Sequence, residues 1–560
     1  MFEQQEAGGA EVDLERKAKT YLKIAQVRAN GLNFEGAQEF YGSAFELLEQ
    51  VEQTKTATLG NQPHQKHIFR LAVFEPETLD PGLIETTDTE EIVKNFFEGL
   101  VELDTELNVI PAIARRWHVD ESGQRYRFEL RPGLKWSDGA PLTARDFVFA
   151  WLRNLHPDTA AEFAHQLYVV QGAEEFHQGQ NSDSSSVGIK ALDDLNLEIG
   201  LKVPTTFFPY LLAASITFPQ PAHLIQTKEN DWAKPENLVC NGPFKVEYWQ
   251  PNQEMLLTQN SFYHGFTNSN LDQAYMYFID EPGLDDYLAN TIDWCAIWSQ
   301  AELLKHQLEG THLVQYLGTF FLEFSCGFAP FNNRLIRQAF AKTINQNELV
   351  HEVWDNGQRP ASGGVVPPGI PGHSPEIGSR FDPAAARDLL KQAGFDSGTG
   401  LPPLILAAPP GFRTTPFYLQ ASWRNHLGVD IQIEEISAEE IVTRMRQGSI
   451  QLSLSGWGVD YPDPDDVLRV LFHSASPSNY LGWRNQRFDQ LVEQAVHLTN
   501  HTARSTLYHQ ADRILVTEEA AIVPLYYRQD YGLLRPNFIL EGADRVIRGG
   551  AFKLKNIRAL

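Results

Sequence analysis

The amino-acid sequence predicts an α/β protein with more than one globular domain and a helical hairpin at its N-terminus. The chain has 560 residues, whereas a single hydrophobic core rarely serves more than about 250–300 residues. Residues 404–460 alternate strand and helix patterns, and residues 12–52 carry apolar side chains at helical spacing. The first pattern indicates a parallel sheet, and the second indicates two packed helices.

The composition is that of a globular protein with an acidic surface. Hydrophobic residues make up 42% of the chain and charged residues 21%. The formal net charge of −26 repels phosphates, so we expect no nucleic acid partner. Cys240, Cys295 and Cys326 lie far apart without metal-ligand spacing. They predict no metal site and buried free thiols, with at most one disulfide.

The first residues also bear on the cellular compartment. Residues 1–9 are acidic and polar, without the basic and apolar segments of a signal peptide. No apolar run reaches the length of about 18 residues that a membrane span needs. From these features we expect either a cytoplasmic protein or a sequence form without its export information.

The N-terminal segment predicts two helices joined by a turn at Gly31–Asn33. Tyr21, Ile24 and Ala25 lie on one apolar face, and a second face includes Tyr41. The pattern resembles one tetratricopeptide repeat, and a single repeat cannot bury a solenoid core. We therefore expect the hairpin to dock on the main body, to self-associate or to meet another protein. Residues 54–66, rich in Thr, Gln, Gly, Pro and His, predict a linker.

The main body begins with local patterns of strands and helices. Residues 68–73 alternate as a strand does, residues 89–100 predict a helix, and residues 192–201 predict another strand. Residues 241–258 predict a β-hairpin. Further along the chain, Asp382 and Pro383 open a predicted helix that Gly394 closes.

Residues 126–151 predict a strand, an elaborated turn and a helix. The strand alternates up to Leu130, and Arg131–Gly133 and Ser137–Gly139 carry turn residues. Thr143 is a good N-cap, and apolar residues recur behind it at helical spacing. Asp146 occupies the capping-box position that normally holds Glu or Gln. Nothing in this stretch is a catalytic group.

Residues 404–460 predict a βαβαβ unit with parallel strands. The predicted strands are 404–407, 429–433 and 450–457, and the predicted helices are 419–427 and 439–447. Ligands of such sheets lie beyond the carboxyl ends of the strands. The segment at the end of the third strand is Trp457-Gly-Val-Asp-Tyr-Pro-Asp-Pro-Asp-Asp466.

This segment packs four carboxylates into seven residues: Asp460, Asp463, Asp465 and Asp466. A glycosidase pair, a Ca²⁺ site and a solvated acidic loop are all open in principle. The spacing of an EF-hand is absent, and neighbours on one loop do not make a catalytic pair of carboxylates. The pattern by itself therefore leaves the role of this loop open.

Several stretches together resemble, in the same order, the family 5 extracellular solute-binding proteins, which include the oligopeptide and dipeptide receptors of ABC importers. The resemblance covers roughly residues 67–560. The matching stretches are 75–81, 97–101, 130–151, 241–245, 334–339, 456–464 and 522–526.

The resemblance implies a two-lobed fold of the periplasmic-binding-protein type with an extra inserted subdomain, to which the helical hairpin is added. Such a protein encloses its ligand in a cleft between the lobes and closes by a hinge motion. The implied division is a hairpin at 1–53, a linker at 54–66, lobe I at 67–97, 196–300 and 529–560, a subdomain at 98–195 inserted in lobe I, and lobe II at 301–528.

The resemblance also implies ligand-binding residues in the segment that follows the third strand. Asp460 matches the aspartate with which peptide receptors of the family hold the α-ammonium group of the ligand. Gly456, Trp457 and Gly458 match a segment whose main-chain groups pair with an extended peptide, as a sheet edge pairs with an added strand.

Other site positions match or depart from the family pattern. Thr86 and Thr87 fall where the family has another strand-like contact, and Phe163 falls where it has an aromatic residue, although a core phenylalanine is equally open. Ala438 stands where close relatives have tryptophan, which predicts a wider pocket. Arg528 stands where they have tyrosine, which predicts a cation at the ligand.

The resemblance implies that the protein captures peptides or another small solute for an ABC permease in the cell envelope, without a cofactor. Enzyme motifs are absent: residues 351–355 read HExxD instead of HExxH, and there is no Walker A loop, GxGxxG or GxSxG. We therefore predict that the protein is not an enzyme. The alternative is an intracellular ligand sensor with the same fold, whose hairpin contacts a regulatory partner.

Overall fold

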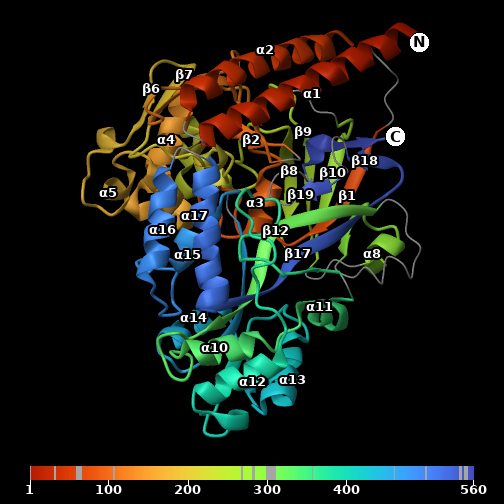
Figure 1. Ribbon diagram of the computed structural model, residues 1–560. Coiled ribbons are helices and arrows are strands. Elements are labelled where there is room, and N and C mark those ends of the chain that lie inside the picture. The colour runs from red at the N-terminus through yellow and green to blue at the C-terminus, as the bar shows by residue number, and fades with distance from the viewer. Residues whose placement is uncertain are drawn as a thin grey trace. The chain divides into compact units, whose positions relative to one another are not determined.

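The chain folds into two compact units. The computed structural model describes residues 2–30, 33–58, 66–104, 107–265, 269–279, 284–297, 311–355, 357–459, 461–498, 501–540, 545–547 and 553–560. Unit 1 comprises Met1–Ala296, Glu309–His312 and Gly532–Leu560, and unit 2 comprises Ile297–Leu308 and Leu313–Tyr531. Each unit contains both helices and strands, as the predicted fold class requires (Figure 1).

Unit 1 contains a mixed sheet and a separate antiparallel sheet. The mixed sheet has the order β11 (Trp294–Ile297), β1 (Ile68–Val73), β10 (Gln273–Phe278), β9 (Glu254–Gln259) and β8 (Phe244–Gln250). Strand β1 is parallel to β10 and β11, whereas β8, β9 and β10 are antiparallel. The antiparallel sheet has the order β4 (Ala114–Val119), β5 (Arg125–Leu130), β7 (Asn196–Gly200) and β6 (Ile189–Ala191).

Shorter elements complete unit 1. Its further helices are α3 (Thr87–Val93), α4 (Ala144–Leu155), α5 (Ala173–His177), α6 (Phe208–Leu211), α7 (Ala222–Lys228) and α8 (Leu284–Leu288). Its further strands are β2 (Val101–Leu103), β3 (Val109–Pro111), β18 (Phe538–Leu540), β19 (Arg545–Ile547) and β20 (Ile557–Ala559).

Two predicted elements of unit 1 are shorter than the sequence pattern indicates. The helix predicted over 89–100 ends at Val93, because the side-chain amide of Asn95 donates to the carbonyls of Glu91 and Ile92. The strand predicted over 192–201 begins only at Asn196. Its first residues form a turn in which the Asp193 carboxylate accepts the N–H groups of Leu195 and Asn196.

The predicted strand, turn and helix at residues 126–151 are confirmed. Thr143 caps α4, and its backbone N–H donates to Asp146 at 2.8 Å, so the aspartate completes a capping box. The face of α4 that carries Phe147 and Trp151 is fully buried. The Trp151 indole N–H donates to the Thr217 carbonyl at 2.8 Å, which satisfies the polar atom of this buried side chain.

The predicted N-terminal hairpin is present and longer than expected. It consists of α1 (Phe2–Asn30) and α2 (Phe34–Thr58), which run side by side in Figure 1. Because α2 continues to Thr58, residues 54–58 of the predicted linker are helical, and residues 59–65 lie outside the described residues. The likeness to a tetratricopeptide repeat stays a prediction.

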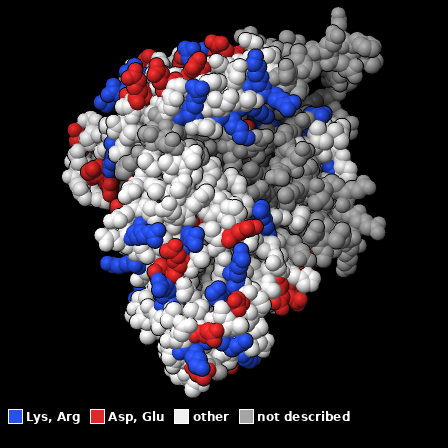
Figure 2. Space-filling model, viewed as in Figure 1, with Lys and Arg blue, Asp and Glu red and all other residues white. Residues whose placement is uncertain are grey.

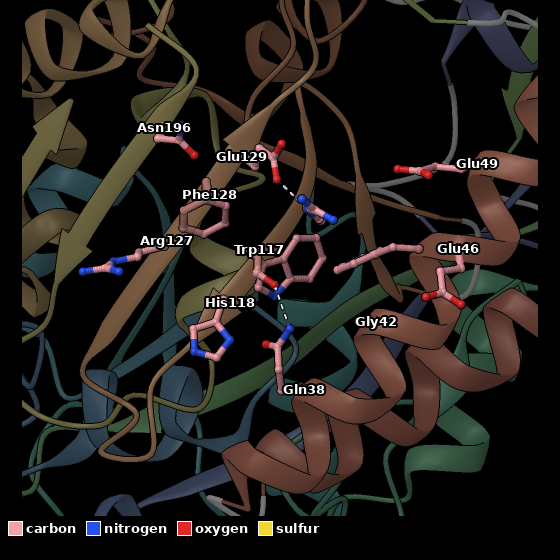
Figure 3. A pocket seen from close by; sticks show the side chains of 12 residues that line it. Gln38, Gly42, Glu46, Glu49, Trp117, His118, Arg127, Phe128, Glu129 and Asn196 are labelled. Atoms are coloured by element: carbon pink, nitrogen blue, oxygen red, sulfur yellow. Dashed lines mark hydrogen bonds and ion pairs between the residues drawn. The ribbon is translucent and has the colours of Figure 1, made fainter. Parts of the chain in front are cut away.

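The hairpin docks on the antiparallel sheet of its own unit. Helix α2 lies along edge strand β4, where the Gln38 amide donates to the Trp117 carbonyl at 3.2 Å and accepts from the Val119 N–H at 3.3 Å (Figure 3). The Trp117 ring also packs against Tyr41 and Phe45, at centroid distances of 5.0 and 4.7 Å. One side-chain amide thus pairs with the edge strand much as a neighbouring peptide group would.

A buried ionic cluster fixes the C-terminal segment of unit 1. The Lys555 ammonium donates to Glu98 at 3.1 Å and to Glu102 at 2.7 Å, and Lys553 donates to Glu102 at 2.7 Å. His264 lies 2.6 Å from the second Glu98 oxygen. Burial alone would raise the pKa of Glu98, but Lys555 and His264 outweigh it and hold that pKa well below its usual range.

Unit 2 is built around the predicted βαβαβ segment, which is confirmed. Its strands have the order β15 (Gln432–Glu435), β14 (Ile405–Ala408), β16 (Leu452–Gly458), β12 (Thr311–Phe324) and β17 (Ile522–Leu534), and β13 (Arg359–Pro360) pairs with β17. Strand β14 is parallel to β15 and β16, and β12 is antiparallel to β16. The carboxyl ends of β14, β15 and β16 therefore lie at the same edge of the sheet.

Helices cover this sheet and form the core of unit 2. They are α10 (Arg334–Ala341), α11 (Gln346–Trp354), α12 (Pro383–Gln392), α13 (Thr415–Leu427), α14 (Ala438–Arg446), α15 (Pro464–Phe472), α16 (Gln486–His497) and α17 (His501–Arg513). Asp382 caps α12 and Pro383 is its first residue, as predicted. Leu406 and Leu452 of the sheet and Trp423 of α13 belong to one buried cluster.

The remaining composition-based predictions concern thiols, membrane spans and charge. Cys240 and Cys295 are free and buried, as expected, whereas Cys326 is free and partly exposed; burial raises the pKa of Cys240 to about 12. In the part of the chain that the structure describes, no helix has the length and apolarity of a membrane span. Acidic and basic side chains alternate over the face shown in Figure 2, with bases along α1 and acids along α2.

Candidate functional site

The carboxyl end of β16 offers an unpaired strand edge. Strand β12 pairs with β16 along its whole length, from Leu452 to Gly458. On its other side, β14 ends at Ala408, and the pairing between these two strands stops at Ser453. Within the described residues, no strand pairs with this side of β16 at Gly456 or Gly458.

The main-chain groups of two glycines point to this unpaired edge. The Val459 N–H donates to the Leu317 carbonyl on β12 at 2.9 Å. Main-chain groups of successive strand residues point to alternate edges, so those of Trp457 also face β12. It follows that the N–H and C=O groups of Gly456 and Gly458 face the unpaired edge, where an extended chain can bond to them.

Two aromatic rings from β12 explain why glycine stands at both positions. A β-carbon at Gly456 would lie 2.7 Å from ring carbons of Phe320, and one at Gly458 would lie 2.8 Å from the ring of Tyr316. Any side chain at these positions would have to displace a ring. The rings therefore form the floor beside the unpaired edge, and glycine is required for them to lie there.

Three of the four carboxylates in the acidic loop have structural partners. Asp463 caps α15 and forms two hydrogen bonds of 2.8 Å with Arg504. Asp465 accepts two bonds of 2.6 Å from Arg469. All three, including Asp466, are at most 6% exposed. They fix the loop to α15 and α17, so the alternatives of a solvated acidic loop and a glycosidase pair do not apply to them.

Two further contacts involve Trp457 and Tyr461, which lie before and after Asp460 in the sequence. On one side, the Trp457 indole N–H donates to Asp466 at 2.9 Å. On the other side, the buried Tyr461 hydroxyl donates to Asp465 at 3.1 Å. Asp460 itself lies outside the described residues, and its role stays a prediction. Among the described residues, no group of three or more His, Cys, Asp or Glu side chains is placed to hold a metal ion.

The two positions that depart from the family pattern lie in unit 2. Arg528 on β17 stacks its guanidinium 4.6 Å from the centroid of Tyr316, the ring that covers Gly458. The structure thus brings Arg528 beside the predicted main-chain site. Ala438 is the exposed first residue of α14 and follows β15, so it lies at the edge of the sheet where β16 also ends.

The predicted residues of unit 1 lie on two different elements. Thr86 caps α3, its N–H donates to Glu77 at 3.1 Å, and its carbonyl accepts from Glu90. Both of its main-chain groups are therefore occupied, and Thr87 begins the helix. Phe163 is half-buried in the 3-10 helix Glu162–Val169. Their contact with a ligand stays a prediction.

Several aromatic and cationic residues around the unpaired edge were not predicted from the sequence. Tyr316 and Phe320 reach the site through the register between β12 and β16, which no local pattern reveals. Phe412 and Arg413 follow β14, and Phe412 contacts Phe320 at 5.4 Å between centroids. The rule that ligands lie beyond the carboxyl ends of parallel strands could have indicated these two residues.

A buried carboxyl group lies on β12, the strand that pairs with β16. Glu323 on β12 is opposite Ser453 on β16 and is 3% exposed. Ser453 donates to it at 2.6 Å, and Tyr480 donates at 2.8 Å. Burial raises the pKa of Glu323 to about 7, although these two hydrogen bonds oppose the rise.

This raised pKa predicts that Glu323 weakens the fold at alkaline pH. Between the unfolded pKa of 4.5 and about 7, the folded state holds a proton that the unfolded state has lost. Stability therefore falls as the pH rises through this window, by about 3 kcal/mol. Replacing Glu323 with Gln keeps the volume of the side chain and removes this pH-dependent contribution to the stability of the fold.

We expect E323Q to be more stable than the wild type at pH 8 and similar to it at pH 5, as measured by urea unfolding at both pH values. Asp512, whose pKa burial also raises to about 7, titrates in the same window in both proteins. Its contribution cancels when the variant is compared with the wild type. An equal pH dependence in both proteins would contradict the prediction.

A cavity lies where the hairpin meets the antiparallel sheet of unit 1. Its volume is about 370 Å³, and Figure 3 shows Gln38, Glu46 and Glu49 of α2 facing Trp117 and Glu129. Glu129 bonds to Arg115 and Arg116. Gly42 leaves open space on the helix side. The cavity lacks an unpaired strand edge such as that of β16, so the site at β16 is the stronger candidate for peptide binding.

Comparison with known proteins gives a family match over most of the chain. The family model of the bacterial extracellular solute-binding proteins, family 5 Middle, matches residues 108–479. The probable deoxycholate-binding periplasmic protein YgiS of Escherichia coli is 33% identical over 479 residues, which cover 82% of this chain and 88% of YgiS. The periplasmic oligopeptide-binding protein OppA of Salmonella typhimurium is 28% identical over 477 residues, which cover 82% and 87%.

Solved structures of oligopeptide-binding proteins have the same fold. The murein tripeptide binding protein MppA of Escherichia coli matches with a TM-score of 0.76 at 25% identity, over 89% of this chain and 99% of that chain. A periplasmic oligopeptide-binding protein of Borrelia burgdorferi matches with a TM-score of 0.73 at 26% identity, over 88% and 100%. The predicted periplasmic-binding-protein fold is thereby confirmed.

Proposed function

The chain belongs to the family 5 bacterial extracellular solute-binding proteins, and we propose on this premise that it captures peptides for an ABC importer. Relatives with this fold are named as oligopeptide-binding or murein tripeptide-binding proteins. Members of the family are binding proteins and not enzymes, which supports binding and delivery without covalent chemistry. The comparisons give no support to the intracellular sensor.

The observation that carries this proposal is the unpaired edge of β16. The main-chain groups of Gly456 and Gly458 are oriented to bond with an extended chain, and the rings of Phe320 and Tyr316 support it from below. Hydrogen bonds to the main chain of the peptide give affinity that does not depend on its side chains, so one receptor can bind many peptide sequences. We propose that Asp460 anchors the α-ammonium group at the end of this edge.

Other parts of the proposal rest on the family alone. We propose that Thr86, Thr87 and Phe163 of unit 1 also contact the ligand and that Trp457 borders it. We further propose residues 98–195 as an inserted subdomain and a location in the cell envelope, because the named relatives are periplasmic. The partner would then be an ABC permease. A protein partner for the hairpin has no support beyond its docking on its own unit.

Strand pairing predicts a periodicity that a peptide series can test. Only every second residue of a bound extended peptide points its N–H toward β16. A methyl group on such a nitrogen removes a bond and adds bulk, so we expect affinity to fall about 10- to 100-fold. A methyl group on the intervening nitrogen points away from β16 and should have a much smaller effect.

The measurement is calorimetric titration with tetra-alanine peptides, each N-methylated at one of the second, third or fourth residues. The second and fourth should behave alike and differ from the third, and the unmethylated peptide serves as the reference. An equal loss at all three positions, or no loss at any, would show that the peptide does not pair with β16 as a strand.

A further inference from the structure

The two helices of the N-terminal hairpin carry opposite charges. Residues 16–28 of α1 contain five bases and no acid, and residues 34–51 of α2 contain four acids and no base. Figure 2 shows both sets on one face of the molecule, with the bases along α1 and the acids along α2. In a chain with a net charge of −26, a helical segment with bases and no acids is a local exception.

The apolar faces of both helices are occupied within unit 1. Helix α1 buries Leu22 and Ala25, which are at most 1% exposed. Helix α2 buries Phe45, whose ring packs against Trp117 of the sheet at 4.7 Å between centroids. The hairpin also lies outside residues 108–479, which the family model matches. A role for the outer face of the hairpin is therefore specific to this chain.

Exposed charges form one stripe along each helix. Arg16 and Lys23 are exposed on α1, and Glu39 and Glu46 are exposed on α2. The members of each pair are seven residues apart, which places them on the same side of a helix two turns apart. We call these pairs the basic stripe and the acidic stripe. Within the described residues, Arg16, Glu39 and Glu46 form no ion pair.

Gly42 lies between the two carboxylates of the acidic stripe. A β-carbon at this position would meet no atom within 4 Å, so packing within the described residues does not require glycine. Glycine inside a helix makes that helix less stable than alanine does. Its effect here is a hollow beside Glu46, within the cavity that both residues line. The hollow leaves room for a side chain of another molecule to approach the acidic stripe.

Two copies of this hairpin have matching charges in one symmetric arrangement. Copies related by a two-fold axis use the same surface, so every contact between them occurs twice. If the axis runs along the hairpin, α1 of each copy lies on α2 of the other, and bases meet acids at both contacts. If α1 met α1 and α2 met α2, like charges would meet on both helices and oppose association.

We propose that the protein forms a two-fold symmetric dimer in which the basic stripe of one protomer binds the acidic stripe of its partner. A second copy of this chain presents both stripes, so no different protein is needed to complement the hairpin. The exposed Val27, at 55%, adds apolar surface on α1 next to the basic stripe. The inference does not depend on peptide capture, because neither stripe belongs to the candidate site at β16.

Reversing the charges of one stripe at a time tests this arrangement. In the variant R16E/K23E both stripes are acidic, and in the variant E39K/E46K both are basic. Each variant by itself would bring like charges together at both contacts of the dimer. A mixture of the two variants would again bring opposite charges together at both contacts. Because the four side chains are exposed, the melting temperatures should stay close to that of the wild type.

The measurement is sedimentation velocity over a range of protein concentrations. At about 0.15 M NaCl, screening limits the repulsion between the negatively charged copies to about 8 Å. We expect a dimer for the wild type and for the control K190E/K228E, which reverses two exposed lysines elsewhere on unit 1. The dissociation constant should rise at least about 10-fold in each stripe variant. An equimolar mixture of the two variants should restore the dimer, which also shows that both are folded.

Other outcomes overturn the inference. It is wrong if the wild type stays monomeric, if either stripe variant alone dimerises as the wild type does, or if mixing the variants restores no dimer. A monomeric wild type that binds vesicles of equimolar phosphatidylcholine and phosphatidylglycerol, when R16E/K23E does not, would show that an anionic membrane covers α1 instead. Peptide affinity should be equal in all of these proteins, so a failure of this inference is distinguishable from a failure of the proposed function.

Discussion

Replacing Lys555 with Met is expected to destabilise unit 1 by about 3–5 kcal/mol, since it leaves two buried carboxylates without their shared cation. Lys555 is bonded to both Glu98 and Glu102, and the three side chains are 10%, 4% and 14% exposed. Met fills a similar volume, so the loss would come from unpaired charge and not from a cavity. Lys553 still reaches Glu102, but Glu98 would keep only its hydrogen bonds from Tyr263 and His264.

Urea unfolding of K555M and of the control K234M measures this effect. Lys234 also forms an ion pair, with Asp231 at 2.8 Å, but both side chains are more than half exposed. The control should therefore lose no more than about 1 kcal/mol. The double variant E98Q/K555M should lose less than the sum of the two single variants, because both substitutions affect one interaction. Strictly additive losses would show that the pair is not coupled.

The pH dependence of this cluster has a defined sign. The folded-state pKa of Glu98 lies below its unfolded value, so the stabilisation is present above about pH 4.5 and is lost as the pH falls toward the folded pKa. The acid-induced destabilisation of the wild type should therefore be smaller in K555M, which has already lost the interaction. Unfolding measured from pH 6 to pH 3 provides this comparison.

The spacing of apolar residues predicted those helices and strands whose bounds are set by residues nearby in the sequence. The βαβαβ unit was visible because apolar residues alternate in its strands and because Gly428 and Gly448, both at positive φ, end its helices. The helix predicted over 89–100 is shorter than its pattern indicates, and one of the contacts at its end is not local. Asn95 turns its side chain onto the helix end and accepts the N–H of Leu554, a partner more than 450 residues away in the sequence.

The candidate site could be predicted only where a motif marks it. Gly456 and Gly458 were identified from the family resemblance, and the unpaired edge of β16 gives a physical reason for both glycines. The rings of Tyr316 and Phe320 were not predicted, because their position depends on how β12 and β16 are aligned. The arginine at 413 was not predicted either, since an exposed arginine in a loop has no distinguishing local pattern.

Replacing Asp460 with Asn is expected to weaken the binding of peptides with a free amino terminus by about 2–5 kcal/mol, which is about 30-fold to several-thousand-fold in affinity. The substitution keeps the shape of the side chain and removes its charge, so an enclosed α-ammonium group would lose its counter-ion. The fold should persist, because Trp457 and Tyr461 on either side are held by Asp466 and Asp465.

Calorimetric titration of the wild type and D460N with a peptide and with its N-acetylated form completes the test. Acetylation should weaken the wild type by a comparable factor and D460N much less, because the two changes remove one interaction. D430N, which changes an exposed aspartate on the same unit, should bind as the wild type does. If D460N binds the free-amine peptide as tightly as the wild type, the ammonium is not the anchor. We would then expect the ligand to be a sugar or another non-peptide solute, because neither needs a counter-ion for an amino group.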